Sequence, residues 1–305
     1  MNMVRTGVLL AAMTALFMVA GYALGGVTGL VLALVFSFST NAYAFWNSDK
    51  LALSAHNARP ATKMSHPELV AAVERLAAKA GLPTPAVYVI DRRQPNAFAT
   101  GRDPKNAAVA VTHGLLNNLW REHIDAVIAH ELAHIKNRDT LTMTIAATFA
   151  GAITVLANIG FLMGGNRNDG RFGFVGVLIA AFLAPTAAAL IEMTISRTRE
   201  FAADRTAAEI TGKPLALAGA LQRIADRTPW NKMASAETHP ATAHMFIVNP
   251  LVGLRLDRLF ATHPPTEHRI AALEAMAHQR GYVPPPGPVQ QILKRSTSIP
   301  RVRRK

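Results

Sequence analysis

Four long apolar runs place the strongest constraint on the fold of this chain. Each run approaches the roughly 20 residues that a helix needs to cross a bilayer. A hydrophobic fraction of 50% with only 17% charged residues also indicates that part of the chain lies in lipid. Short polar or glycine-rich turns join the runs in pairs, which predicts two transmembrane hairpins. The runs are residues 4–20, 27–46, 141–165 and 174–195.

Two other interpretations of these runs stay open at this point. The first run follows a short start with one positive charge, so it could be a cleaved signal peptide. The second pair contains threonines, Asn158 and Pro185, and could instead form two helices buried in a soluble core. We favour the hairpins, because two such long runs in succession are rare in soluble domains.

The charge distribution predicts which side of the bilayer the polar parts occupy. An even number of crossings puts residues 49–139 and 196–305 on one side. The net charge of +13 and a basic C-terminal tail favour the cytoplasm for that side. Arg167 and Arg171 in the opposite loop argue weakly against this orientation. No basic stripe interleaved with aromatic residues is present, so nucleic acid is not an expected partner.

The expected fold class is mainly α, of the α+β type, with four transmembrane helices and a polar domain split between two parts of the chain. Three short extended pieces at 86–90, 96–100 and 107–112 predict a small β-sheet in that domain. The expected boundaries are a hairpin at 1–48, the first part of the domain at 49–139, a second hairpin at 140–195, the rest of the domain at 196–285 and a disordered basic tail at 286–305.

One motif in the polar domain combines residues that can bind a metal with a residue that can accept a proton. His130, Glu131 and His134 lie in residues 121–137, where apolar residues recur at spacings of three and four and predict a helix. On this helix the two histidines are one turn apart on one face, so both can bind the same zinc ion. Glu131 cannot join them without strain, but its carboxylate can take the proton of a zinc-bound water. The motif therefore predicts a general base beside a catalytic metal.

A second polar helix, predicted at residues 196–204, offers a third ligand. Glu200 and Asp204 lie one turn apart, so Glu200 can complete the ligand set while Asp204 accepts the outer N–H of a ligating histidine. Asn137 is a second candidate for such a supporting contact. The alternative is a solvated acidic face balanced by neighbouring arginines. Because the chain has no cysteine, only His, Asp or Glu side chains could hold a zinc ion.

Four segments together resemble the HtpX group of bacterial membrane zinc proteases, which is related to the CAAX prenyl proteases. The resemblance extends from the first hairpin to about Met276. It implies a multi-pass protein of the bacterial inner membrane with a zincin-like domain facing the cytoplasm. The implied activity is zinc-dependent endopeptidase cleavage of misfolded or damaged membrane proteins, or of unfolded polypeptides, during envelope stress. The segments are residues 130–139, 96–101, 199–204 and 262–265.

The resemblance also implies roles for single residues. Asn96 would help to hold the substrate backbone. His263 and Arg269 would line the cleft opposite the metal, His263 with a catalytic role, although a histidine before two prolines is equally an ordinary helix start. One zinc ion per chain would be bound by three residues, with a fourth as general base: His130, His134, Glu200 and Glu131.

Residues 107–112, just before the motif helix, are our candidate for the sheet edge that pairs with an extended peptide substrate. The main alternative function is a membrane scaffold whose zinc only stabilises the fold. Such a site would need a fourth protein ligand and would have no use for Glu131. A metal transporter is a further alternative, but it should carry ionisable residues in mid-membrane, and the apolar runs carry none there.

Overall fold

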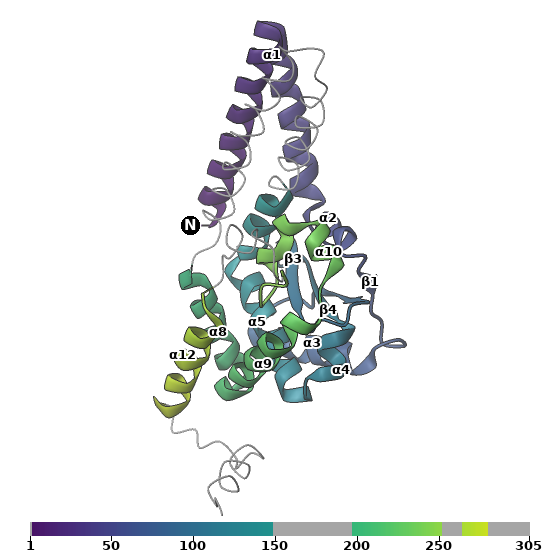
Figure 1. Cartoon of the computed structure of the whole chain (residues 1–305), viewed down its shortest axis with the longest axis vertical. Helices are drawn as coiled ribbons and strands as arrows, with labels where there is room; N and C mark the ends of the chain where they lie inside the picture. The colour runs from purple at the N-terminus through teal and green to yellow at the C-terminus, as the bar shows by residue number, and fades with distance from the viewer. Residues whose placement is uncertain (1, 149–196, 252–263, 280–305) are drawn as a thin grey trace, which may run out of the picture.

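The structure is a computed structural model that describes residues 2–148, 197–251 and 264–279 (Figure 1). Most of the second predicted hairpin, His263 and the predicted basic tail lie outside the described residues. The described part is mainly helical and contains one small mixed sheet. The fold class predicted from the sequence agrees with this architecture, whereas the count of four membrane crossings stays a prediction.

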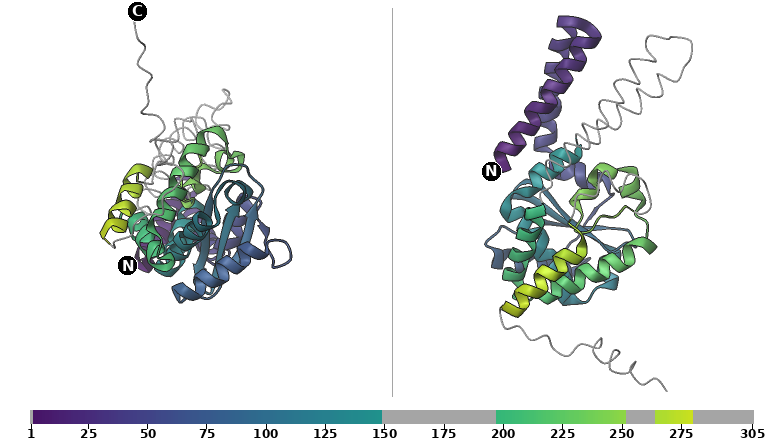
Figure 2. Two further views of the ribbon diagram at one scale, coloured as in Figure 1. Left: turned by 90° about the horizontal axis from the view of Figure 1, so that it is seen from below. Right: turned by 60° about the vertical axis from the view of Figure 1, so that its left-hand side comes forward.

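The N-terminal helix α1, Asn2–Trp46, is a hairpin of two arms that projects away from the rest of the molecule (Figures 1 and 2). The arms meet at Gly25 and Gly26, which have non-helical backbone angles, and Gly26 has a positive φ of 58°. The arms approach closely where Gly21 faces Gly29, because a Cβ atom on Gly21 would lie 2.5 Å from the Gly29 carbonyl oxygen. Glycine therefore sets both the turn and the packing of the predicted first hairpin.

One arm of this hairpin has the dimensions of a membrane span. Among the described residues, only Gly25–Trp46, with 22 residues, is a helix both long and apolar enough to cross a bilayer, and the apolar stretch Thr6–Val19 is shorter. Large apolar side chains on the longer arm face outward, with Val27 and Phe38 exposed by 73% and 75%. An outer surface of this kind suits contact with lipid better than contact with water.

The segment after the hairpin joins it to the polar domain through two short elements. It forms helix α2, Ser48–Ala55, and the short strand β1, Arg59–Pro60. Helix α3, Pro67–Ala80, ends at Gly81, which has a left-handed φ of 70°. Its N-cap residue, His66, makes no side-chain capping bond, and the preceding Ser65 hydroxyl accepts from the Thr62 amide.

The sheet has the strand order β1-β2-β4-β3, with β2 spanning Ala86–Ile90, β3 Ala97–Asp103 and β4 Asn106–Thr112. Strand β4 pairs in parallel with β2 and antiparallel with β3. The prediction that residues 107–112 form the free edge is therefore wrong, because β4 lies inside the sheet and β3 lies at its edge. A strand buried along nearly its whole length suits the interior position.

The remaining helices surround the sheet and build two apolar clusters. Helix α5, Arg121–Asn137, has the bounds predicted from its periodicity, and it packs against α3, α8, α9 and strand β3. Alternate residues of β3 contribute to different clusters, since Ala97 packs on the α5 side and Phe98 on the other. The other elements are α4 (His113–Asn118), α8 (Arg197–Thr211), α9 (Pro214–Arg227), η1 (Thr228–Trp230), α10 (Ala234–Thr238), η2 (Pro240–Met245) and α12 (Thr266–Gln279).

Candidate metal centre

Helix α5 carries the motif residues into the interior of the domain. His130, Glu131 and His134 expose 0%, 1% and 4% of their surface, because α5 lies between β3 and α8. The helix ends at Arg138, which has a left-handed φ of 58°, and the chain then begins a new helical segment that covers residues 139–148. The motif is therefore held on a rigid, buried helix.

Three side chains converge on one point, as the sequence predicted. The Nε2 atoms of His130 and His134 lie 3.1 Å apart. Glu200 reaches them from α8, with its carboxylate oxygens 3.7 Å from the His130 ring and 3.6 Å from the His134 ring. One ligand atom from each of the three residues lies within 4.8 Å of the other two. The spacing allows one cation to contact all three groups.

Two aspartates support the outer nitrogens of the rings. Asp204 lies 3.0 Å from Nδ1 of His130, and Asp139 lies 3.3 Å from Nδ1 of His134. A proton on each Nδ1 leaves the Nε2 lone pairs free to face the shared point. Asp204 was predicted for this role, but the structure gives the second position to buried Asp139 and leaves Asn137 exposed. Helical spacing could not predict this contact, because the helix ends between the motif and Asp139.

Glu131 has the environment of a base that works near neutral pH. Burial raises its pKa to about 7, and the negative charge of Glu200 adds to this effect, while His134 and Arg269 oppose it. Neither carboxylate oxygen makes a well-formed hydrogen bond within the described residues, although the Ala99 amide lies close by. The side chain is therefore available to interact with a water molecule or a substrate.

The two histidines differ in their protonation. Burial lowers the pKa of His130 to about 4, although Asp204 opposes this shift. Burial also disfavours the charged form of His134, but its contact with Asp139 and the charges of Glu200 and Glu131 raise its pKa to about 9. Without a metal the cluster thus favours a proton on His134, and a cation that binds both rings must displace it.

Arg269 occupies a structural position beside the cluster. It is 1% exposed and holds Asp204 through two hydrogen bonds, from Nε at 2.8 Å and from Nη2 at 2.7 Å. Its Nη1 atom lies 3.3 Å from Glu200 and donates to the Ile247 carbonyl oxygen at 2.8 Å. Burial opposes the charge on Arg269, but Asp204 raises the pKa of Arg269 and Arg269 in turn lowers the pKa of Asp204. Its Nη2 atom also lies 3.5 Å from the Nε2 atom of His130, so Arg269 contacts two of the three metal-binding side chains as well as Asp204.

Asn96, the predicted substrate residue, is also fully buried. Its side-chain amide donates from Nδ2 to the Val248 carbonyl oxygen at 2.8 Å. His263 lies outside the described residues, so its predicted role stays a prediction. The structure thus brings together His130, His134, Glu200 and Glu131 and adds Asp139 to their supporting residues.

The donor set fits a transition metal. Two imidazole nitrogens and one carboxylate oxygen are typical ligands of zinc at sites that keep one position open. Within residues 2–148, 197–251 and 264–279, the only group of at least three metal-binding side chains at suitable spacing is His130, His134 and Glu200. Buried Glu131 lies beside this group without being part of it.

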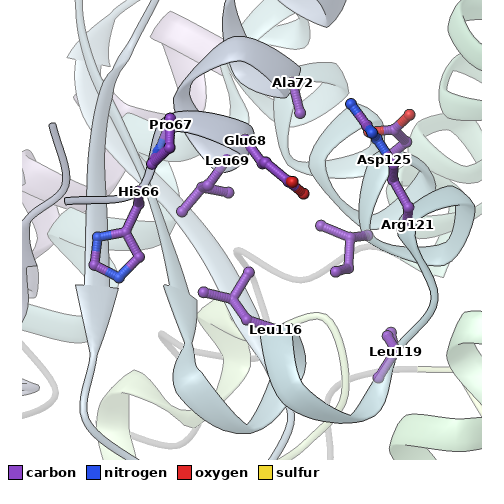
Figure 3. Close-up of a pocket in the computed structure, with 10 residues that line it drawn as sticks. His66, Pro67, Glu68, Leu69, Ala72, Leu116, Leu119, Arg121 and Asp125 are labelled. Atoms are coloured by element: carbon purple, nitrogen blue, oxygen red, sulfur yellow. The ribbon is translucent and has the colours of Figure 1, made fainter. Parts of the chain in front are cut away.

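A separate cavity of about 350 Å³ lies between the starts of α3 and α5 and helix α4 (Figure 3). Its lining combines apolar side chains such as Leu69 and Leu116 with the charged residues Glu68, Arg121 and Asp125. Figure 3 shows Glu68 directed into the cavity toward Arg121 and Asp125. None of the metal-centre residues lines it, so this cavity is distinct from the cluster.

A helix with two histidines and a buried carboxylate, completed by a glutamate from a second helix, defines a metallopeptidase type of site. The sequence profile of Peptidase family M48 matches residues 63–277, which include every residue of the cluster. The chain belongs to this family. The crystal structure of S. mikatae Ste24p is similar to it, with 18% sequence identity and a TM-score of 0.49. The match covers 90% of this chain but only 65% of Ste24p, so the chain spans less than two thirds of that protein.

Proposed function

We propose that this chain is a zinc-dependent endopeptidase of the bacterial inner membrane, of the HtpX type, with its active site on the cytoplasmic side. Its substrates would be misfolded or damaged membrane proteins and unfolded polypeptides. One observation carries the proposal: a buried carboxylate, Glu131, without a well-formed hydrogen bond, lies next to three groups that can share one cation. A site that only stabilised the fold would have no use for this carboxylate.

Each side chain of the site has a separate role in the proposed reaction. His130, His134 and Glu200 would hold the metal, and Asp204 would orient the first of these rings. When bound, zinc supplies a Lewis acid that polarises a carbonyl group and acidifies water. Glu131, with its pKa raised to about 7, would accept a proton from the attacking water and pass it to the leaving amine.

The membrane part of the proposal rests on the N-terminal hairpin. Its longer arm, Gly25–Trp46, has the length and composition of a bilayer span, and its apolar side chains point outward. The excess of positive charge favours the cytoplasm for the catalytic domain. A protease anchored in this way would meet its substrates at the membrane surface, which suits a role in removing damaged membrane proteins.

The test is metal analysis and cleavage of casein or a membrane-protein substrate by detergent-purified protein, together with the Glu131→Gln variant. We expect one zinc per chain in both proteins and a loss of cleavage of about 10²–10⁴-fold in the variant, the usual contribution of a general base. Preserved cleavage in Glu131→Gln would remove the proposed base. A metal-loaded protein that cleaves nothing would favour the alternative, a non-catalytic scaffold with a structural zinc.

A further inference from the structure

The outer edge of β3, next to the metal centre, is covered by the chain itself. We define the strap as residues 245–248, Met-Phe-Ile-Val, which begin at the last residue of η2. An antiparallel bridge pairs Phe98 with Phe246. The Ile247 amide donates to the Ala97 carbonyl oxygen at 3.0 Å. The strap therefore pairs with the edge strand as an extended peptide would.

Asn96 extends this pairing by one residue. Its Nδ2 atom donates to the Val248 carbonyl oxygen at 2.8 Å, and its Oδ1 atom accepts from the Val248 amide at 3.4 Å. A side-chain amide that binds both backbone groups of one residue takes the place of a further residue of the edge strand. This is the residue that the resemblance assigned to holding the substrate backbone, and here it holds the strap.

The strap covers the part of the edge that a substrate would need. Along β3, the backbone N–H and C=O groups of successive residues point alternately toward β4 and toward the outer edge of the sheet. The backbone groups of Ala97, Ala99 and Gly101 point toward the outer edge. The Gly101 carbonyl oxygen already accepts from the Thr140 hydroxyl at 2.9 Å. Ala99 lies beside α5, and its backbone amide is close to Glu131. An extended peptide placed next to the base must use Ala97 to Ala99, the stretch opposite the strap.

The strap is also connected, through Arg269, to α8, the helix that carries Glu200 and Asp204. Arg269 donates from Nη1 to the Ile247 carbonyl oxygen at 2.8 Å while its other donors hold Asp204. Displacement of the strap would free one donor of a buried arginine, and the carbonyl oxygen of an incoming peptide could accept from it. The same side chain that supports the metal centre would thus serve either occupant of the edge.

We infer that the strap is an internal occupant of the substrate position, and that substrates bind by displacing it from the edge of β3. This inference rests on the proposed function. Phe246 and Ile247 are 0% and 2% exposed, so displacement of the strap loses buried apolar contacts unless the competitor supplies similar side chains. The substrate class is therefore extended segments with large apolar residues, such as those that a misfolded membrane protein exposes. A folded protein offers no such segment and leaves the strap in place.

The first experiment measures displacement without cleavage. The full-length Glu131→Gln protein, loaded with zinc in detergent, is mixed with a synthetic peptide that copies residues 244–249, and binding is followed by fluorescence anisotropy. Hydrogen exchange of the Ile247 amide is then measured at saturation. We expect exchange at least tenfold faster than without peptide. The matched control is the same peptide with N-methylated alternate amides, which keeps the side chains but cannot pair as a strand, and it should not change the exchange.

Two results of this experiment would overturn the inference: a peptide that does not bind, or one that binds and leaves the exchange of Ile247 unchanged. Neither result depends on catalysis. Failure of the proposed function would appear separately, as a zinc-loaded wild-type protein that cleaves no substrate.

The second experiment locks the strap in place. The chain contains no cysteine, so Ala97→Cys with Ile247→Cys introduces a single pair at directly opposed positions. The oxidised protein should cleave an unfolded substrate at least tenfold more slowly than the same protein after reduction, and each single variant should respond to neither treatment. Equal cleavage by the oxidised and the reduced protein, with the disulfide verified by mass spectrometry, would show that the strap need not move.

Discussion

Two buried clusters in this domain contain histidine side chains, but the ring nitrogens have different kinds of partner in each. At the metal centre, the Nε2 atoms of His130 and His134 face each other at 3.1 Å. At the second cluster, both ring nitrogens of His56 are satisfied, by the Ser235 hydroxyl at 3.1 Å and the Thr242 hydroxyl at 2.9 Å. Thr242 donates to the His239 carbonyl oxygen, so it accepts from the His56 ring.

The difference separates a histidine that serves function from one that serves the fold. His56 packs against Phe98 and Phe246, and its hydrogen bonds are complete within the protein. The metal centre instead brings the Nε2 atoms of two histidines together beside the Glu200 carboxylate, an arrangement that a bound cation would stabilise. Burial alone therefore does not mark a functional histidine, since both clusters are almost fully buried.

The largest expected effect is the loss of a ligand. Glu200→Gln removes the charged donor from the cluster. Loss of a supporting partner lowers metal affinity by up to about 100-fold, so we expect the loss of this ligand to lower zinc affinity by more than that. Isothermal titration with zinc and a competing chelator measures this change. The hydrogen bonds of His56 should be unaffected, because its partners are Ser235 and Thr242. Unchanged zinc affinity would mean that the cation is held elsewhere.

The next prediction concerns pH and the His56 cluster. Burial, with the nearby charges of His239 and Arg92, lowers the pKa of folded His56 to about 4, below its ordinary value of 6.5. The unfolded chain therefore binds more protons between these values, so stability is complete above pH 6.5 and falls as the pH drops toward 4. The loss should reach roughly 3 kcal/mol, at about 1.4 kcal/mol per pH unit.

The measurement is the free energy of unfolding in detergent between pH 7 and pH 4. His56→Gln removes the titrating ring, so the slope of stability with pH should be shallower in this variant than in the wild type. Equal slopes in the two proteins would assign the acid sensitivity to other groups.

A smaller effect should separate Asp139 from Asn137. Asp139→Asn weakens the contact with Nδ1 of His134, so we expect zinc affinity to fall by about 10–100-fold. Asn137→Ala, on the exposed end of α5, should leave the affinity unchanged. The reverse result would restore the prediction made from the sequence, in which Asn137 supports the ligand.

The smallest effect should come from one hydroxyl in the His56 cluster. Thr242→Val keeps the shape of the side chain but leaves one ring nitrogen of His56 without its acceptor, which costs about 1–3 kcal/mol. Thr238→Val, which removes an exposed hydroxyl of α10, should change stability by less than about 0.5 kcal/mol. Neither variant should alter zinc affinity. A change in zinc affinity would show that the two clusters are coupled.

Local sequence patterns predicted the elements that depend on local interactions. The periodicity of residues 121–137 gave the bounds of α5, and β-branched residues between turns gave the strand Ala86–Ile90. The spacing of His130 and His134 predicted that they share a site, because one helical turn fixes their separation. Glu200 followed from the need for a third donor in a chain without cysteine.

Only the tertiary structure decided the contacts between distant segments. Which strand lies at the edge depends on pairing between β2 and β4, and the strap reaches β3 from about 150 positions further along the chain. Asp139 reaches His134 because the chain turns at Arg138, and a helical pattern cannot predict the path of the chain beyond the end of the helix. The sequence alone determined which residues could bind a metal and act as a base, since spacing on one helix is a local property. The position of the substrate edge and its occupant were decided by long-range packing, which no local pattern encodes.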